Sequence, residues 1–214
     1  EKVKGKKVVV FGMGKSGLSA ARLLKYLDAE VWAVNQDDPL NWAHRDDIFL
    51  LIGSERCVEQ DKAQKLFLAT DFITISPGIS TTVPCLAEAV EAGVPIYSEI
   101  ELASWFVQAP IIAVTGTNGK TTTVVMISSI LEKAGIKCFT GGNIGVPFCD
   151  YAHKVLMEGV SEEYVLLELS SFQLETIHSF APHIAVGLNI SFSHSERYEN
   201  LDAYVAAKFR IGLN

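Results

Sequence analysis

The segment TGTNGKTTT, residues 115–123, combines residue types that bind the phosphates of a nucleotide. Its two glycines permit a compact turn, and Lys120 and Thr121 follow where a helix is expected to begin. In such a loop, backbone N–H groups surround phosphate oxygens, the lysine reaches the β- and γ-oxygens, and the hydroxyl binds Mg²⁺. The Walker A pattern has a further glycine where this chain has Val114, so the motif is shortened to G-x-x-G-K-T. We still expect a phosphate-binding loop, because a strand pattern precedes it and an apolar helix pattern follows.

Other polar residues follow predicted strands and could complete a metal site beside this loop. Glu168 ends the apolar run VLLE, where a carboxylate can help to position Mg²⁺ next to a phosphate loop; alternatively it is a solvated acid. Asn143 lies in the glycine-rich segment GGNIG after another strand candidate, as a ligand contact or as a simple turn residue. His194 follows the strand pattern IAVGLNI and could be a ligand at the same sheet edge. Lys208 lies on an Ala-flanked helix, a pattern that by itself predicts a side chain reaching solvent.

A second glycine loop lies near the start of the chain, in VVVFGMGKSGLSAA. The pattern G-x-G-x-x-G at residues 12–17 separates a strand from a helix, as in dinucleotide-binding proteins. An NAD-dependent oxidoreductase would need an acidic residue at the end of the second strand, and Asn35 stands there. We therefore prefer a non-redox nucleotide ligand, with an oxidoreductase or a purely packing loop as alternatives. The segment ISPGIS, residues 75–80, is expected on the same sheet edge, as a ligand loop or a plain turn.

Short β-branched runs alternate with amphipathic helical patterns, which predicts two α/β domains with parallel sheets. The first, residues 1–98, is expected to be Rossmann-like, and the second, residues 99–214, is expected to be an incomplete P-loop NTPase-type domain. Strands are predicted at 6–12, 29–34, 48–53, 71–76, 94–98, 111–115, 164–170 and 183–190. Helices are predicted at 16–29, 84–93, 99–107, 120–135 and 201–214.

Composition restricts the class of partner and the compartment. The formal net charge of −7 argues against nucleic acid or an anionic membrane as a partner. The four cysteines form no C-x-x-C pair, which favours a reducing compartment, and no apolar run approaches the ~20 residues of a membrane span. We expect a cytoplasmic protein. The chain lacks an initiator Met and stops inside a helix pattern, so a fragment is expected.

Five motifs along the chain resemble those of the Mur ligases, the ATP-dependent amide-forming enzymes of peptidoglycan precursor synthesis. They are SPGI, GTNGKT, GGNIG, ELSSFQLE and NISFSHSERY with a later AAK, and the resemblance covers essentially all 214 residues. ELSSFQLE and the GMGKSG loop are most similar to the branch that adds D-glutamate to UDP-N-acetylmuramoyl-L-alanine; another Mur-type ligase is the alternative. The resemblance implies that the substrate carboxylate takes the γ-phosphate of ATP as an acyl phosphate, which the D-glutamate amine then displaces.

The resemblance also implies roles for individual residues. Contacts to the UDP part of the substrate are implied for Lys15, Ser16, Asn35, Gln36 and Gly78. ATP binding is implied for Gly116, Thr117, Asn118, Gly119, Lys120, Thr121 and Thr122. Contacts to the muramoyl-alanine part are implied for Asn143, Ser170 and Gln173. One Mg²⁺ would be held by Thr121 and Glu168, and a second by His194 and a carbamate on Lys208. Catalytic roles are thereby implied for Lys120, Glu168, His194 and Lys208.

The chain also departs from the family pattern. Ser193 stands where the family usually has Asp before the ligand histidine, Glu196 stands where Asp is usual, and Asn35 replaces an acid common at the uracil site. The resemblance implies a third domain that binds D-glutamate and closes over ATP, which is expected to lie outside this sequence. This chain alone is expected to bind the UDP-linked substrate, and nucleotide weakly, without turnover. A monomer is expected. A nucleotide sensor that has lost its chemistry remains a further hypothesis, for which Ser193 could be a sign.

Overall fold

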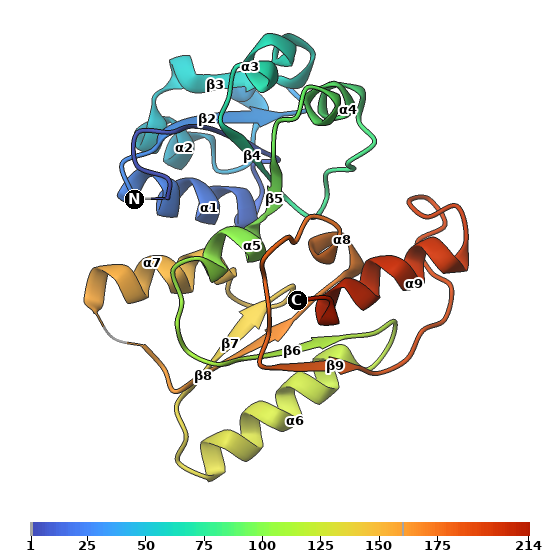
Figure 1. Ribbon diagram of the computed structural model, residues 1–214. Helices are drawn as coiled ribbons and strands as arrows, with labels where there is room; N and C mark the ends of the chain where they lie inside the picture. Colours follow the sequence, from blue (N-terminus) through green and yellow to red (C-terminus); the bar gives the residue numbers. More distant parts are fainter. Residues whose placement is uncertain (1, 160) are drawn as a thin grey trace. The chain divides into compact units, whose positions relative to one another are not determined.

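The computed structural model describes residues 2–159 and 161–214. The chain divides into two compact units, one reaching Leu102 and the other beginning at Ala103 (Figure 1). The predicted boundary at residue 98 coincides with the end of β5 (Ile96–Ser98), and α5 (Glu99–Ser104) crosses the division between the units. Within the described residues, no helix combines the length and the apolar character needed to cross a membrane.

The first unit is built on a five-stranded sheet in which every pairing is parallel, as the sequence predicts. The strand order is β3-β2-β1-β4-β5. The strands are β1 (Lys7–Phe11), β2 (Glu30–Asn35), β3 (Cys57–Glu59), β4 (Phe72–Ile75) and β5. The helices are α1 (Lys15–Tyr26), α2 (Arg45–Ile52), α3 (Gln64–Leu68) and α4 (Pro84–Glu91). The central strand β1 is apolar and almost entirely buried, as expected for a parallel strand covered on both faces.

The strand predicted at residues 48–53 is wrong, because this segment belongs to α2. A strand would place Ile48, Leu50 and Ile52 on one face, whereas Leu50 is 89% exposed and the two isoleucines are buried. The isoleucines are one helical turn apart, and Asp46 and Asp47 lie in the first turn, where acidic side chains stabilise a helix. A short apolar run fits either structure, so the run alone could not decide between them. The third strand of the sheet is β3 instead.

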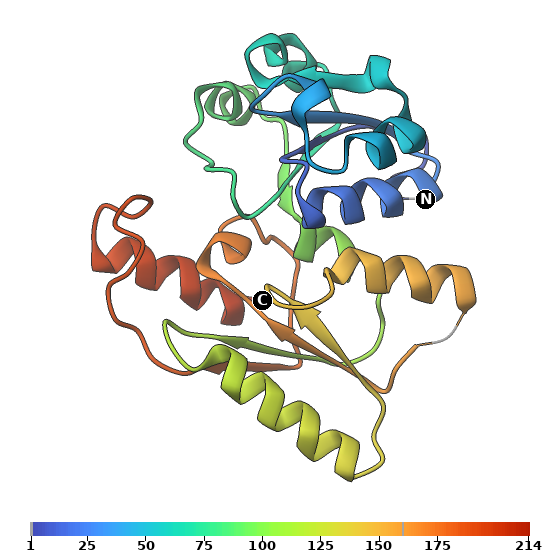
Figure 2. The same ribbon diagram turned by 180° about the vertical axis from the view of Figure 1, so that it is seen from behind.

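The second unit contains a four-stranded parallel sheet with the order β7-β8-β6-β9. Its strands are β6 (Ile111–Thr115), β7 (Cys138–Gly142), β8 (Tyr164–Glu168) and β9 (Ile184–Gly187). Its helices are α6 (Lys120–Lys133), α7 (Phe148–Glu158), α8 (Ser171–Leu174) and α9 (Leu201–Phe209). Within this unit α6 covers one face of the sheet, and α7, α8 and α9 lie on the other (Figures 1 and 2). All five residues of β6 are buried, which fixes the strand from which the phosphate-type loop leaves the sheet.

Candidate functional site

In the first unit, the early glycine loop packs directly against the SPGI segment, and both lie at the carboxyl edge of the sheet, where the sequence placed them. Gly12 has a φ of +92°, which favours glycine, and its carbonyl oxygen accepts a hydrogen bond of 2.6 Å from Ser76 Oγ. A Cβ at Gly12 would lie 2.8 Å from a side-chain carbon of Ile79. A Cβ at Gly17 would lie 2.0 Å from the Gly12 carbonyl oxygen. Two of the three glycines are therefore required by close packing.

The predicted UDP-contacting residues all lie at the carboxyl edge of the first sheet. Lys15 and Ser16 begin α1 after β1, Asn35 ends β2 and Gln36 follows it, and Gly78 follows β4. Strands β1 and β4 are neighbours at the point where the strand order reverses, and ligands of open α/β sheets bind at such a point. The position suits a ligand, and the contacts to UDP stay a prediction.

We expect Gly17→Ala to lower the free energy of unfolding of the first unit by about 2 kcal/mol or more, because the new methyl group overlaps a backbone carbonyl. Gly14→Ala is the matched control: Gly14 has a φ of −77°, and no atom of residues 2–159 or 161–214 lies within 4 Å of its Cβ position. The control should change the free energy of unfolding by less than about 1 kcal/mol. Urea unfolding of both variants checks this, and equal losses would contradict the packing argument.

In the second unit, the loop TGTNGKT connects β6 to α6. Val114, which stands in place of the extra Walker glycine, is a buried residue of β6, so the loop starts after it. Gly119 has a φ of +83° and precedes the first residue of the helix. The side of the loop is held by Asn189, whose carbonyl oxygen accepts from Thr117 N (2.9 Å) and whose side chain exchanges two 3.0 Å hydrogen bonds with the Asn118 backbone. The loop is thus fixed to the segment after β9.

Lys120, the first residue of α6, folds its side chain back over this loop. Its ammonium group donates hydrogen bonds of 3.0 Å to the Gly116 carbonyl oxygen and 3.1 Å to the Thr117 carbonyl oxygen. A lysine at this place carries its positive charge across the mouth of the loop, next to the N-terminal end of a helix of 14 residues. Both features attract an anion.

Glu168 is the centre of the polar group at the end of β8. The residue is 2% exposed, and its two oxygens accept hydrogen bonds of 2.7 Å from Thr121 Oγ1 and 2.8 Å from Asn143 Nδ2. The backbone adds a third link, because Asn143 N donates to the Glu168 carbonyl oxygen at 2.8 Å. The structure therefore brings together three residues that the sequence placed on separate elements.

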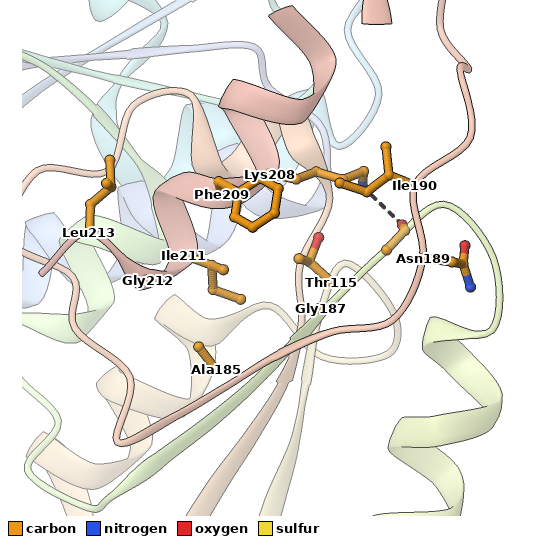
Figure 3. Close-up of a pocket in the computed structure, with 11 residues that line it drawn as sticks. Thr115, Ala185, Gly187, Asn189, Ile190, Lys208, Phe209, Ile211, Gly212 and Leu213 are labelled. Carbon is orange, nitrogen blue, oxygen red and sulfur yellow. Dashed lines mark hydrogen bonds between the residues drawn. The ribbon is translucent and has the colours of Figure 1, made fainter. Parts of the chain in front are cut away.

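Lys208 is buried, so its helix pattern alone gave the wrong expectation of a solvent-reaching side chain. The residue is 3% exposed, and its ammonium group donates a 2.9 Å hydrogen bond to the Gly116 carbonyl oxygen (Figure 3). The same ammonium group lies 4.8 Å from the ring centre of Tyr204. Burial, and secondarily the positive charge of Lys120, lowers the pKa of Lys208 to about 8. Its neutral form is therefore accessible near physiological pH.

A cavity of about 360 Å³ lies beside this lysine, bounded by β9 and the end of the chain (Figure 3). Thr115, Gly116 and Lys208 line it from the loop side, and Phe209 and Leu213 line it from the other. Phe209 and Leu213 are 64% and 69% exposed, so the apolar side of the cavity is open to solvent.

His194 lies on the turn after β9, close to the aromatic cluster around Tyr204. Its ring centre is 4.8 Å from that of Phe172 and 6.3 Å from that of Tyr204. Its Nδ1 atom is 3.0 Å from a carboxylate oxygen of Glu196, which leaves Nε2 without that contact. Tyr204 thus touches both His194 and Lys208, and its hydroxyl lies 3.1 Å from Thr117 Oγ1 in the phosphate-type loop.

Ser170 and Gln173 have a structural task that the sequence analysis did not identify. Ser170 precedes α8, its hydroxyl accepts from Gln173 N at 3.3 Å, and Gln173 Oε1 accepts from Ser170 N at 3.0 Å. This reciprocal arrangement is a capping box, whose sequence signature S-x-x-Q was available.

Thr122 is exposed on α6. Asn189 and Tyr204 were also missed, because neither a single Asn after a strand nor a Tyr within a helix indicates a loop contact.

The fold and this group of residues define a class: an α/β protein with a Rossmann-like unit followed by a P-loop-type nucleotide-binding unit. Comparison with known protein families gives a particular assignment. Residues 6–98 match the Mur ligase MurD-like N-terminal domain, and residues 114–214 match the Mur ligase middle domain. The chain therefore belongs to the Mur ligase family and carries its N-terminal and middle domains.

Curated relatives agree with this assignment. The UDP-N-acetylmuramoylalanine–D-glutamate ligase of Desulfatibacillum aliphaticivorans is 40% identical over 99% of this chain and 46% of its own length. The ligase of the same name from Desulfosudis oleivorans is 41% identical over 98% of this chain and 44% of its own length. The chain thus spans about half the length of these relatives. One solved structure shares the fold: that of a UDP-N-acetylmuramate:L-alanyl-gamma-D-glutamyl-meso-diaminopimelate ligase from Neisseria meningitides. The TM-score is 0.58, and the sequences are 20% identical over 97% of this chain and 67% of that one.

Proposed function

We propose that this chain supplies the substrate-binding and ATP-binding domains of an ATP-dependent ligase that joins D-glutamate to UDP-N-acetylmuramoyl-L-alanine. The observation that carries the proposal is the convergence of Thr121 and Asn143 on the buried carboxylate of Glu168, beside the loop that ends in Lys120. The relatives named for this reaction, 40% and 41% identical over nearly the whole chain, support the choice of substrates. We assign recognition of D-glutamate to the part of the relatives' length that this chain does not span. The cytoplasm is the compartment in which the proposed enzyme would act.

The residues around Glu168 fit Mg²⁺ by their chemistry. The Thr121 hydroxyl and the Glu168 carboxylate are oxygen donors in direct contact, and Mg²⁺ is usually bound by one or two protein oxygens together with substrate phosphates. Mg²⁺ bound there would neutralise negative charge on the phosphates of ATP. In the proposal, Asn143 holds the carboxylate in orientation through its 2.8 Å hydrogen bond.

A second Mg²⁺ would be held by His194 and a carbamate on Lys208. The neutral amine of Lys208, which its lowered pKa makes accessible, attacks the carbon of CO₂, forms an N–C bond and releases one proton. The product is an anionic oxygen ligand in place of a cation. Burial of Lys208, its contact with Gly116 O and the shared contact of Tyr204 with His194 and Lys208 support this part of the proposal.

The chain's own residues position the reacting groups. Backbone N–H groups at the N-terminal end of α6 surround the phosphates of ATP, while those of Thr117 and Asn118 keep the loop attached to Asn189. Lys120 gives up its contacts with the Gly116 and Thr117 carbonyl oxygens and binds phosphate oxygens instead. An oxygen of the substrate carboxylate then attacks the γ-phosphorus, and ADP leaves with the electrons of the broken P–O bond. The D-glutamate amine attacks the acyl carbon, loses a proton and displaces inorganic phosphate. Residues Lys15, Ser16, Asn35, Gln36 and Gly78 hold the UDP group, while Asn143, Ser170 and Gln173 face the muramoyl-alanine part.

Phosphate release by a protein extended to the full length of the relatives tests the proposal. Release should require ATP, UDP-N-acetylmuramoyl-L-alanine and D-glutamate together, and the 214-residue chain alone should bind the UDP-linked substrate without releasing phosphate. Release that continues without D-glutamate, or without the UDP-linked substrate, would contradict the assigned reaction. A titration with NADH separates the oxidoreductase alternative, because the neutral Asn35 at the end of β2 should give no binding.

A further inference from the structure

We propose that Glu175 is a positioning residue for His194, acting through Arg197 and Tyr198. The inference rests on the proposed function, in which His194 binds a metal ion. Glu175, Arg197 and Tyr198 lie within the segments ELSSFQLE and NISFSHSERY, in which roles have so far been given only to other residues. Glu175 follows the last residue of α8, whereas His194, Arg197 and Tyr198 lie on the turn between β9 and α9.

The carboxylate of Glu175 is held by three donors from that turn. Its Oε1 accepts from Arg197 Nε at 3.2 Å and from the Tyr198 hydroxyl at 2.6 Å, and its Oε2 accepts from Arg197 Nη2 at 2.5 Å. The arginine and glutamate side chains are only 10% and 14% exposed. A two-pronged Arg–carboxylate pair fixes orientation as well as distance, and a poorly solvated pair is little screened. Burial, followed by the hydrogen bond to Glu175, raises the pKa of Tyr198, so its hydroxyl remains a donor.

Arg197 and Tyr198, which supply these donors, are connected to His194 by the short intervening chain and by backbone hydrogen bonds. The carbonyl oxygen of His194 accepts from Arg197 N at 2.9 Å and from Tyr198 N at 3.0 Å, which closes a single turn. His194 itself has a φ of +60°, in the left-handed region that residues other than glycine rarely adopt. Such a conformation persists where the surroundings hold it. Arg197 and Tyr198, which bind Glu175, lie at the opposite end of this turn from His194.

The ring of Phe172 contacts both Arg197, which Glu175 fixes, and the imidazole of His194, so it also restrains the orientation of the imidazole. Arg197 lies over this ring at 4.6 Å, and the His194 ring meets it edge-on with 4.8 Å between centres. Phe172 therefore contacts both the guanidinium and the imidazole. Together with the Glu196 contact at Nδ1, this arrangement leaves Nε2 as the atom that can bind a metal ion. Metal-binding histidines are commonly oriented by such neighbouring groups.

The experiment measures Mn²⁺ binding at His194, not turnover, in protein extended to the full length of the relatives. Paramagnetic broadening of the His194 imidazole signals, assigned with His194→Gln, is followed during a Mn²⁺ titration in the presence of ADP. Glu175→Gln weakens the pair with Arg197, and Tyr198→Phe removes only the hydroxyl. The control is Glu158→Gln, which alters an exposed ion pair with Lys154 at 3.9 Å in the same unit.

In the wild type and in Glu158→Gln, broadening should occur at the same Mn²⁺ concentration. Glu175→Gln should need about ten-fold more Mn²⁺, with a smaller shift for Tyr198→Phe, because removal of a group that orients a metal ligand costs ten-fold or more in metal affinity. A lowered melting temperature with an unchanged titration would make Glu175 purely structural and would overturn the inference, while the proposed function stands. Absence of broadening in the wild type would overturn the metal role of His194 and the inference with it, even if D-glutamate-dependent phosphate release is found.

Discussion

Lys120→Met is expected to lower the kcat/KM for ATP-dependent phosphate release by about 10³-fold, the loss typical when one group that stabilises developing charge is removed. Methionine keeps most of the length and the apolar character of the stem but cannot donate to Gly116 O and Thr117 O or to a phosphate. The loop should remain folded, because Asn189 holds Thr117 and Asn118 independently of the lysine. Steady-state assays with protein of the relatives' full length, together with thermal unfolding, measure both effects.

The matched control for this change is Lys133→Met, at the other end of the same helix. Lys133 is exposed and is the last residue of α6, a helix length away from the loop. It should leave kcat/KM within about two-fold of the wild type. If both variants lost activity equally, the effect would come from the charge of the helix as a whole. If neither lost activity, the loop would not be the phosphate site.

The fold could be predicted from the sequence where periodicity and glycine positions agree. Residues 111–114 are apolar and are followed, after Thr115, by a glycine loop and a helix pattern, and β6 and α6 occur there. The apolar run at residues 48–53 was misassigned, because its two buried isoleucines are spaced for a helix but its composition suits a strand. Helix α7 was missed, although its buried residues Phe148, Cys149, Tyr151 and Ala152 have helical spacing.

Parts of the site were predictable because their functional residues lie in short sequence motifs. Lys120, Thr121 and Glu168 each follow or end an apolar strand, and parallel strands bring such positions to one edge of the sheet. Contacts between distant segments were not predictable from one sequence. Tyr204 of α9 reaches Thr117 of the β6–α6 loop, and Glu175 after α8 pairs with Arg197 before α9, so both contacts depend on tertiary packing. The burial of Lys208 was likewise not predictable, because it depends on contacts with segments distant in the sequence.

Glu168→Gln is expected to lower Mg²⁺-dependent nucleotide binding and phosphate release by about 100-fold or more. Glutamine has almost the same shape, and its amide can accept a hydrogen bond from Asn143 and donate one to Thr121, so the buried site keeps its partners. What is lost is the negative charge and one oxygen ligand. The fold should therefore survive while the affinity for the metal–nucleotide complex falls. Calorimetric titration with ADP in the presence and absence of Mg²⁺ measures the change directly.

Glu163→Gln is the control, because Glu163 lies just before the opposite end of the same strand. It is exposed and accepts a 3.0 Å hydrogen bond from Lys137 N. Glu163→Gln should leave the difference in ADP affinity between the titrations with and without Mg²⁺ unchanged. Equal nucleotide affinity of wild type and Glu168→Gln in Mg²⁺ would remove Glu168 from the metal site and leave its bonds to Thr121 and Asn143 as structural contacts alone. A loss that is the same with and without Mg²⁺ would place the carboxylate in nucleotide positioning instead, because only a metal ligand makes the effect depend on the ion.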